Sequence, residues 1–170
     1  MGMLAQYLQV DDETLERLLR LENEALVENI EDLSDVPGAQ VLDIDKLWDG
    51  LHFLLNGVSS TESPAGNKLS EAVIGVHVFN PDDPDADFIS YTYNEELPVI
   101  IDAMHGVDLT MLEKKQFDLS RFRAAGIYPD IWHDSDRIAL FCELSETYQA
   151  LVNFCEQALD AGMHIIFSVY

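Results

Sequence analysis

The 170-residue chain has the length of one domain, and its 48% hydrophobic and 24% charged residues are typical of a globular protein. Its formal net charge of −23, from 32 acidic and 9 basic residues, would repel a phosphate backbone or an anionic membrane surface. We therefore expect neither nucleic-acid nor membrane binding. The partners that such a surface favours are a basic protein or a cation. The acidity is also compatible with a source organism whose proteins are acidic in general.

The N-terminal sequence MGMLAQYLQV lacks the basic and long apolar regions of a signal peptide. No run approaches the ~20 apolar residues of a membrane span. Cys142 and Cys155 form neither a CxxC pair nor a metal-ligand spacing. These features predict a cytoplasmic protein with two reduced, buried thiols.

The first forty residues are predicted to form a strand and a helix, followed by a turn. Leu4–Val10 is a strand that ends at the polar pair Asp11–Asp12, one of which caps a helix. That helix is interrupted or bent near Asn23, and Pro37–Gly38 marks the turn. Its apolar residues are Leu15, Leu18, Leu19 and Leu26.

The segment Val41–Gly57 is predicted to contain the central helix. Asp45 is expected to cap it, and Asn56–Gly57 is expected to end it. Its apolar residues recur at helical spacing at Leu47, Trp48, Leu51, Leu54 and Leu55. Asp45, Asp49 and His52 are then spaced i, i+4 and i+7, which would place two carboxylates and an imidazole on one narrow strip.

Between residues 58 and 93 the pattern changes to loops and strands. Residues 58–68 are predicted to form a loop, and Leu69–Val73 a short helical turn. Ile74–Phe79 and Phe88–Tyr93 have the composition of strands. Asn80–Asp85 between them lacks the spacing of an EF-hand loop, so it is predicted to be a solvated acidic turn and not a metal site.

Three helices are predicted between residues 94 and 125. Asn94 is expected to cap the first, which tolerates Pro98 in its first turns. Leu109–Lys115 and Leu119–Ala125 are short helices. Ile127–Trp132 is predicted to be an extended connection.

The remaining residues are predicted to form a strand–helix–strand unit. Ile138–Glu143 is a strand, although a helix is possible, and Ser145 caps a helix over Glu146–Ala161. His164–Tyr170 is the closing strand, and a parallel pair would be connected by a right-handed crossover. The whole chain is thus predicted to be a single α+β domain, residues 1–170, with several helices packed on a small mixed β-sheet.

Six side chains are candidates for a binding site. They are Asp45, Trp48, Asp49, His52, His77 and Tyr128. Asp45, Asp49 and His52 could bind a divalent metal or act as an acid–base set, but one helix supplies only part of a metal site, so no metal is predicted. The alternative is structural: Asp45 caps the helix, Asp49 is exposed or lightly paired, and His52 is hydrogen-bonded at the core boundary.

No catalytic or nucleotide-binding motif accompanies these residues. Ser59, Ser60 and Ser63 lie in a loop without a G-x-S-x-G sequence. Neither G-x-G-x-x-G nor G-x-x-x-x-G-K-[ST] occurs, so no cofactor is predicted.

Four segments are distinctive in their order and spacing. They are LDIDKLWDGLHFLLNG, LSEAVIGVH, FDLSRFRAAGIYPDIW and ALDAGMHIIFSVY. In these segments the chain resembles the YfbM-like family, a bacterial domain of unknown function, and the resemblance extends from Met1 nearly to the C-terminus. It implies a small, single-domain α+β protein and supplies no activity, cofactor or catalytic residue.

Three classes of function are compatible with the sequence. The favoured one is a non-enzymatic interaction protein, in its sharpest form an immunity-type inhibitor that masks a basic toxin. The alternative is a small-molecule-binding or enzymatic domain, which requires Trp48, Asp49, His52, His77 and Tyr128 to converge on one pocket. In the third, these residues form a core network whose polar atoms are satisfied internally.

Overall fold

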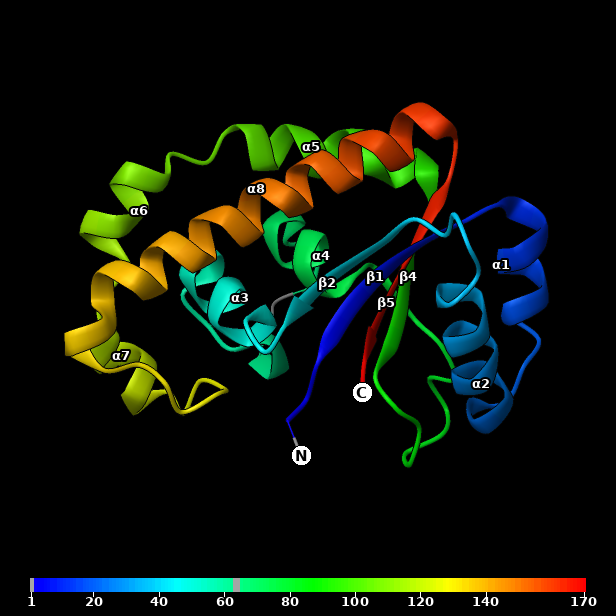
Figure 1. Cartoon of the computed structure of the whole chain (residues 1–170), viewed down its shortest axis with the longest axis horizontal. Coiled ribbons are helices and arrows are strands. Elements are labelled where there is room, and N and C mark those ends of the chain that lie inside the picture. Colours follow the sequence, from blue (N-terminus) through cyan, green and yellow to red (C-terminus); the bar gives the residue numbers. More distant parts are fainter. Residues whose placement is uncertain (1, 63–64) are drawn as a thin grey trace.

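The computed structural model describes residues 2–62 and 65–170 (Figure 1). Over these residues the chain forms a five-stranded antiparallel sheet with the order β2-β1-β5-β4-β3. The strands are β1 (Ala5–Val10), β2 (Val41–Asp45), β3 (His77–Val78), β4 (Ile89–Thr92) and β5 (His164–Val169).

Helices cover both faces of this sheet. In Figure 1, α1 and α2 lie on one face, and α3, α4, α5 and α8 lie on the other. The helices are α1 (Asp12–Leu18), α2 (Asn23–Ser34), α3 (Trp48–Asn56), α4 (Lys68–Ile74), α5 (Leu97–His105), α6 (Leu109–Lys115), α7 (Leu119–Ala124) and α8 (Arg137–Ala161). Short 3₁₀ turns are η1 (Ser60–Glu62), η2 (Asn94–Glu96) and η3 (Asp134–Asp136). Among the described residues no helix is long and apolar enough to cross a membrane.

Strand β1 shows how the sequence builds two cores. Tyr7 lies in the core beneath α8 and packs against the rings of Phe154 and Phe167. Leu8 points to the other face, where it joins Ile166 in the core beneath α1 and α2. Both faces of the sheet are therefore buried, which explains why most of β1 is apolar instead of alternating with polar residues.

The predicted α+β class is confirmed, but the predicted mixed sheet is wrong because every strand pairing is antiparallel. The error comes from Ile138–Glu143, which forms the first turns of α8 and not a strand. Leu140, Leu144 and Tyr148 are buried at a spacing of four residues, while Ile138 is 85% exposed. One helical face thus continues from residue 140 into the predicted helix, and no parallel crossover exists.

The expected caps of two helices also differ. Ser145 lies inside α8, where its hydroxyl donates to the Phe141 carbonyl at 2.7 Å. Asn94 lies in η2, and its side chain contacts the far end of α8. Asp11 does cap α1, and its carboxylate accepts from the Thr14 N–H at 2.8 Å.

Most other predicted elements are confirmed with shifted ends. The two strands predicted over 74–79 and 88–93 shorten to β3 and β4. The loop predicted over 58–68 contains η1, and α4 begins at Lys68. Residues 63 and 64 of that loop, and Met1, lie outside the described residues.

Candidate functional site

Asp45 belongs to strand β2 and does not cap the central helix. Its φ of +51° is a left-handed conformation uncommon outside glycine, and its N–H donates to the Asp43 carboxylate at 2.7 Å. Helix α3 begins three residues later at Trp48, without a side-chain cap. The predicted strip of Asp45, Asp49 and His52 therefore does not form, because residues 41–45 pair with β1 instead of continuing the helix.

Asp49 is buried, and its carboxylate accepts four hydrogen bonds. Oδ1 accepts from the Ser59 hydroxyl at 3.2 Å, and from the hydroxyl and the N–H of Ser60 at 2.9 and 3.1 Å. Oδ2 accepts from the Tyr128 N–H at 3.1 Å. The structural alternative of an exposed or lightly paired Asp49 is thus wrong. Its buried charge is compensated by four donors from two distant segments.

His52 is fully buried beside it, and its two ring nitrogens have different roles. Nδ1 lies 2.9 Å from the Val58 carbonyl, which can only accept, so Nδ1 carries the proton. Nε2 then accepts from the Ser70 hydroxyl at 2.6 Å. Burial lowers the pKa of His52 and outweighs the opposing effects of the Val58 carbonyl and of Asp49. The imidazole is therefore held neutral.

A hydroxyl that donates to a neutral imidazole is the arrangement of a nucleophile and its general base. Here a backbone carbonyl takes the place of the carboxylate that orients the base in a catalytic triad. However, His52 is 0% and Ser70 is 3% exposed, so no substrate can reach the hydroxyl in this structure. The pair therefore acts as part of the core between α3 and α4.

Trp48 and Tyr128 hold the N-terminal segment against α3. The indole N–H of Trp48 donates to the Met3 carbonyl at 3.2 Å, and the Tyr128 hydroxyl accepts from the Met3 N–H at 2.8 Å. The two rings lie 6.2 Å apart. The structure thus brings Trp48, Asp49 and Tyr128 together. Their hydrogen bonds hold Met3 and residues 59–60 in place.

His77 lies apart from these residues, on edge strand β3. It pairs with Tyr91 of β4, which faces the core beneath α1 and α2, whereas α3 packs on the opposite face of the sheet. The His77 ring stacks on Tyr91 at 5.1 Å, and its Nε2 lies 2.8 Å from Glu96. One pocket that contains all six predicted residues is therefore absent from the described part of the chain.

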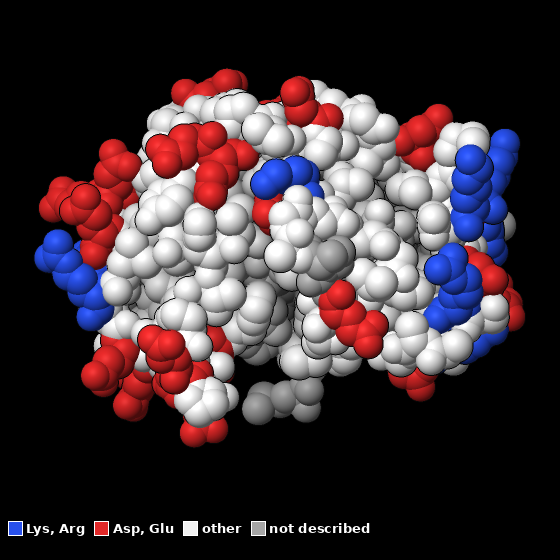
Figure 2. Space-filling model, turned by 180° about the vertical axis from the view of Figure 1, so that it is seen from behind, with Lys and Arg blue, Asp and Glu red and all other residues white. Residues whose placement is uncertain are grey.

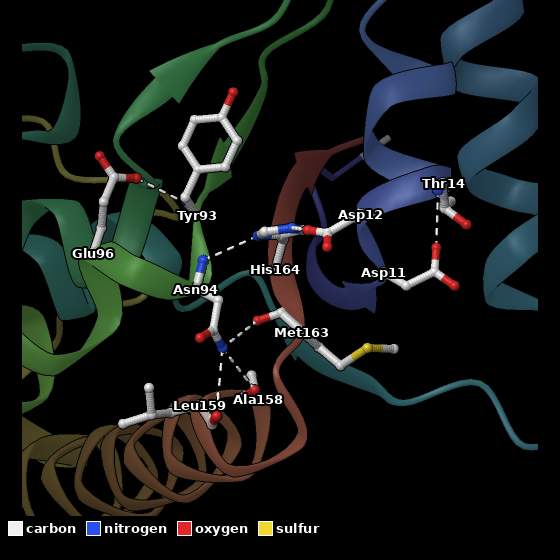
Figure 3. Close-up of polar contacts among 10 residues, drawn as sticks. All are labelled: Asp11, Asp12, Thr14, Tyr93, Asn94, Glu96, Ala158, Leu159, Met163 and His164. Atoms are coloured by element: carbon white, nitrogen blue, oxygen red, sulfur yellow. Dashed lines mark hydrogen bonds and ion pairs between the residues drawn. The ribbon is translucent and has the colours of Figure 1, made fainter.

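A second polar network, which the sequence does not indicate, surrounds His164 at the start of β5 (Figure 3). Its Nδ1 accepts from the Asn94 N–H at 3.0 Å, so Nε2 carries the proton that bonds to Asp12 at 2.5 Å. The Asn94 amide donates to the Ala158 and Met163 carbonyls at 3.1 and 2.9 Å, which satisfies the C-terminal end of α8. Both nitrogens of His164 are engaged, so this network also fixes elements and offers no free base.

Within residues 2–62 and 65–170, no three His, Cys, Asp or Glu side chains converge to hold a metal ion. The groups that remain accessible are surface charges, and they are unevenly distributed. Residues 11–35 hold ten acidic residues, all exposed, and only two basic ones, Arg17 and Arg20. Residues 80–87 add four exposed aspartates, and Asn23 links the two segments by accepting from the Asp87 N–H at 3.0 Å. We call residues 11–35 and 80–87 together the acidic end.

The opposite end of the molecule has a different balance. Residues 109–137, which include α6 and α7, hold five basic and five acidic residues. In Figure 1 this segment lies far from α1 and α2. Figure 2 shows the reverse side, where most basic groups gather at the right-hand end and acidic groups are frequent at the left-hand end. The charge of the chain is therefore polarised along its long axis.

Comparison with known proteins agrees with this architecture. Residues 1–168 match the model of a protein family described as a domain of unknown function, DUF1877. The chain belongs to this family. Protein YfbM of Escherichia coli strain K12, a relative of the chain, is 32% identical over 167 residues, which cover 98% of this chain and 97% of YfbM.

The crystal structure of YfbM from Escherichia coli, a protein of unknown function, has the same fold. It superposes with a TM-score of 0.82 at 30% identity, covering 99% of this chain and all of that one. The resemblance to the YfbM-like family is thus confirmed. Membership in the DUF1877 family establishes the fold and assigns no function.

Proposed function

We propose that the protein is a non-enzymatic interaction domain of the inhibitor or immunity type, which binds a basic protein through its acidic end. The observation that carries this proposal is the polarised charge. Residues 11–35 and 80–87 hold 14 exposed carboxylates against two basic side chains. Such a field speeds the encounter with a cationic partner and orients it before contact.

The shape of the acidic end supports the same partner. A depression of about 580 Å³ lies beside the start of α2, and aromatic and acidic side chains line it together. Phe79 and Tyr91 supply ring surfaces, and Glu22, Asp82 and Asp83 supply carboxylates. Rings and carboxylates are the two kinds of group that bind lysine and arginine side chains.

The alternative, an enzyme or ligand-binding domain at Trp48, Asp49 and His52, finds less support. Asp49 and His52 are buried, and both bond to other parts of the chain. A reaction at either group would first require the core between α3 and α4 to open. Cys155 is buried as predicted, but Cys142 is exposed, so the prediction of two buried thiols is wrong for Cys142. Because both thiols are free, we propose a reducing compartment, the cytoplasm.

The test is an affinity pull-down from a lysate of the organism that carries the gene, at low and moderate salt, read by mass spectrometry. Wild type is compared with a variant neutralised on α2 (Glu24→Gln, Glu28→Gln, Asp32→Asn). The matched control loses the same charge from α5 and α8 (Asp102→Asn, Glu143→Gln, Asp160→Asn). We expect one basic protein that is retained at low salt, released as salt rises, lost by the α2 variant and kept by the control.

Retention of no basic protein under either condition would overturn the proposal. Equal loss of the partner by both variants would also contradict it, because net charge and not the acidic end would then drive binding.

A further inference from the structure

A groove of about 260 Å³ runs between α2 and the sheet, at the border of the acidic end. Its apolar walls include Val27 and Ile30 of α2 and Ile89 of β4. Three exposed carboxylates, those of Glu31, Asp35 and Asp87, also line it.

The groove exists because the sheet face changes character beneath the end of α2. Leu8 and Ile166 pair across β1 and β5 and belong to the core under the helix. Two residues further along, Gln6 pairs with Ser168, so the same face becomes polar. The Gln6 amide donates to the Ser34 hydroxyl at 3.1 Å, which is a polar contact in place of close apolar packing. The helix and the sheet therefore separate here and leave a space.

The carboxylates around this space differ in their partners: Asp87 accepts from the Asn23 side-chain amide at 2.8 Å. Within residues 2–62 and 65–170, neither Glu31 nor Asp35 forms an ion pair. Tyr170 lies on the side of the groove away from α2. Burial raises its pKa, and the carboxylates of Asp43 and Asp45 raise it further. Glu31, Asp35 and Asp87 thus place negative charge at the rim of a partly apolar groove.

We propose that this groove is the anchor site for an arginine side chain of the basic partner. The inference rests on the proposed function and specifies how the partner is held. Small-molecule sites usually measure about 300–1,000 Å³, so a groove of 260 Å³ fits one side chain better than a whole ligand. The aliphatic stem of arginine packs on Val27, Ile30 and Ile89, and its guanidinium reaches the carboxylates at the rim. The planar fork of five donors suits several separated carboxylates better than the single ammonium of lysine.

The test uses N-acetyl-arginine amide as the probe and N-acetyl-citrulline amide, which has the same shape without the charge, as its control. Binding is followed by amide chemical shifts in ¹⁵N-labelled protein. We expect saturable shifts at Gln6, Ser34 and Ser168 with the arginine probe and none with citrulline. The rim variant Glu31→Gln/Asp35→Asn should weaken binding about tenfold, as expected for the loss of two exposed charge contacts together.

The matched control is Asp102→Asn/Glu143→Gln, which removes the same charge from exposed positions on α5 and α8, outside the groove and the acidic end, and should leave the affinity within about twofold. Equal shifts with citrulline, non-saturating shifts, or equal weakening in both variants would overturn the inference. Capture of a basic partner in the lysate experiment, without any response to the arginine probe, would refute the groove alone. Saturable binding of the probe without any captured partner would support the groove as a guanidinium site and refute the proposed function.

Discussion

Replacing His52 by alanine is expected to destabilise the protein by about 3 kcal/mol. The imidazole is fully buried and makes two hydrogen bonds, of 2.9 Å to the Val58 carbonyl and 2.6 Å to the Ser70 hydroxyl. Loss of each of the two bonds costs about 1 kcal/mol, and the cavity left by the ring costs about 1 kcal/mol more. For a chain of this length, a loss of 3 kcal/mol lowers the melting temperature by roughly 6–12 °C.

The measurement is urea and thermal unfolding of the variant beside wild type, followed by circular dichroism. His105→Ala is the matched control, because this histidine is 55% exposed at its side chain and bonds to Glu156 at the surface. Its effect should stay within about 0.5 kcal/mol. Ser70→Ala completes a double-mutant cycle with His52→Ala, in which the two losses should fall short of additivity by about 1 kcal/mol.

A His52→Ala variant as stable as wild type would refute this reasoning, because the buried network would then contribute nothing to the fold. Additive losses in the cycle would refute the specific bond between His52 and Ser70. A stable variant that had also lost a binding activity would instead favour the enzymatic or ligand-binding alternative.

Three further predictions concern pH, packing and thiol reactivity. Burial lowers the pKa of His52 in the folded protein below its ordinary 6.5. At pH values between the folded and the unfolded pKa, the unfolded chain therefore binds more protons than the folded one. Stability should therefore fall as pH drops below 6.5, more steeply in wild type than in His52→Gln, as measured by urea midpoints across pH. A Cβ at Gly50 would lie 2.3 Å from the buried Trp132 ring, so Gly50→Ala should lower the free energy of unfolding by about 1–3 kcal/mol in urea unfolding. Burial raises the pKa of Cys155 to about 12, so iodoacetamide should modify only the exposed Cys142 in folded protein and both thiols in urea, as counted by mass spectrometry.

Each of these expectations has a contrary outcome. Equal pH dependence in wild type and His52→Gln would show that this histidine does not resist protonation. A Gly50→Ala variant with unchanged stability would mean that the Trp132 ring can move without cost. Alkylation of both thiols before unfolding would mean that Cys155 is accessible.

Helices with several turns of apolar periodicity were predictable from sequence because the signal is local. Residues 47–55 carry such a signal, and the structure forms α3 over Trp48–Asn56. Gly162 ends α8 with a φ of +70°, as its position predicts. Short segments were harder, because an apolar run of six residues fits a strand and a helix equally well. Ile138–Glu143 is helical since its buried leucines continue the face of the following turns.

The site was only partly predictable, because its bonds are long-range. The sequence groups five side chains, those of Trp48, Asp49, His52, His77 and Tyr128. The structure brings Trp48, Asp49 and Tyr128 together, buries His52 beside them, and leaves His77 on the edge strand β3. The sequence contains no local sign that Asp12 bonds to His164, which lies 152 residues away. Sheet pairing likewise decides Asp45, which the sequence predicts as the cap of the central helix but which ends strand β2.

Helix α2 offers a physical reason to assign function to the surface instead of the buried network. Glu24, Glu28 and Asp32 are spaced at i and i+4, where like charges repel and destabilise a helix by roughly 0.2–0.5 kcal/mol per pair. Its last turn carries no basic residue, and Glu31 and Asp35 lie near the negative end of the helix dipole. Within the described residues, neither Glu31 nor Asp35 forms an ion pair that would offset this unfavourable charge. Local rules are commonly broken where a surface serves binding, and a cationic partner would relieve the repulsion that the isolated protein retains.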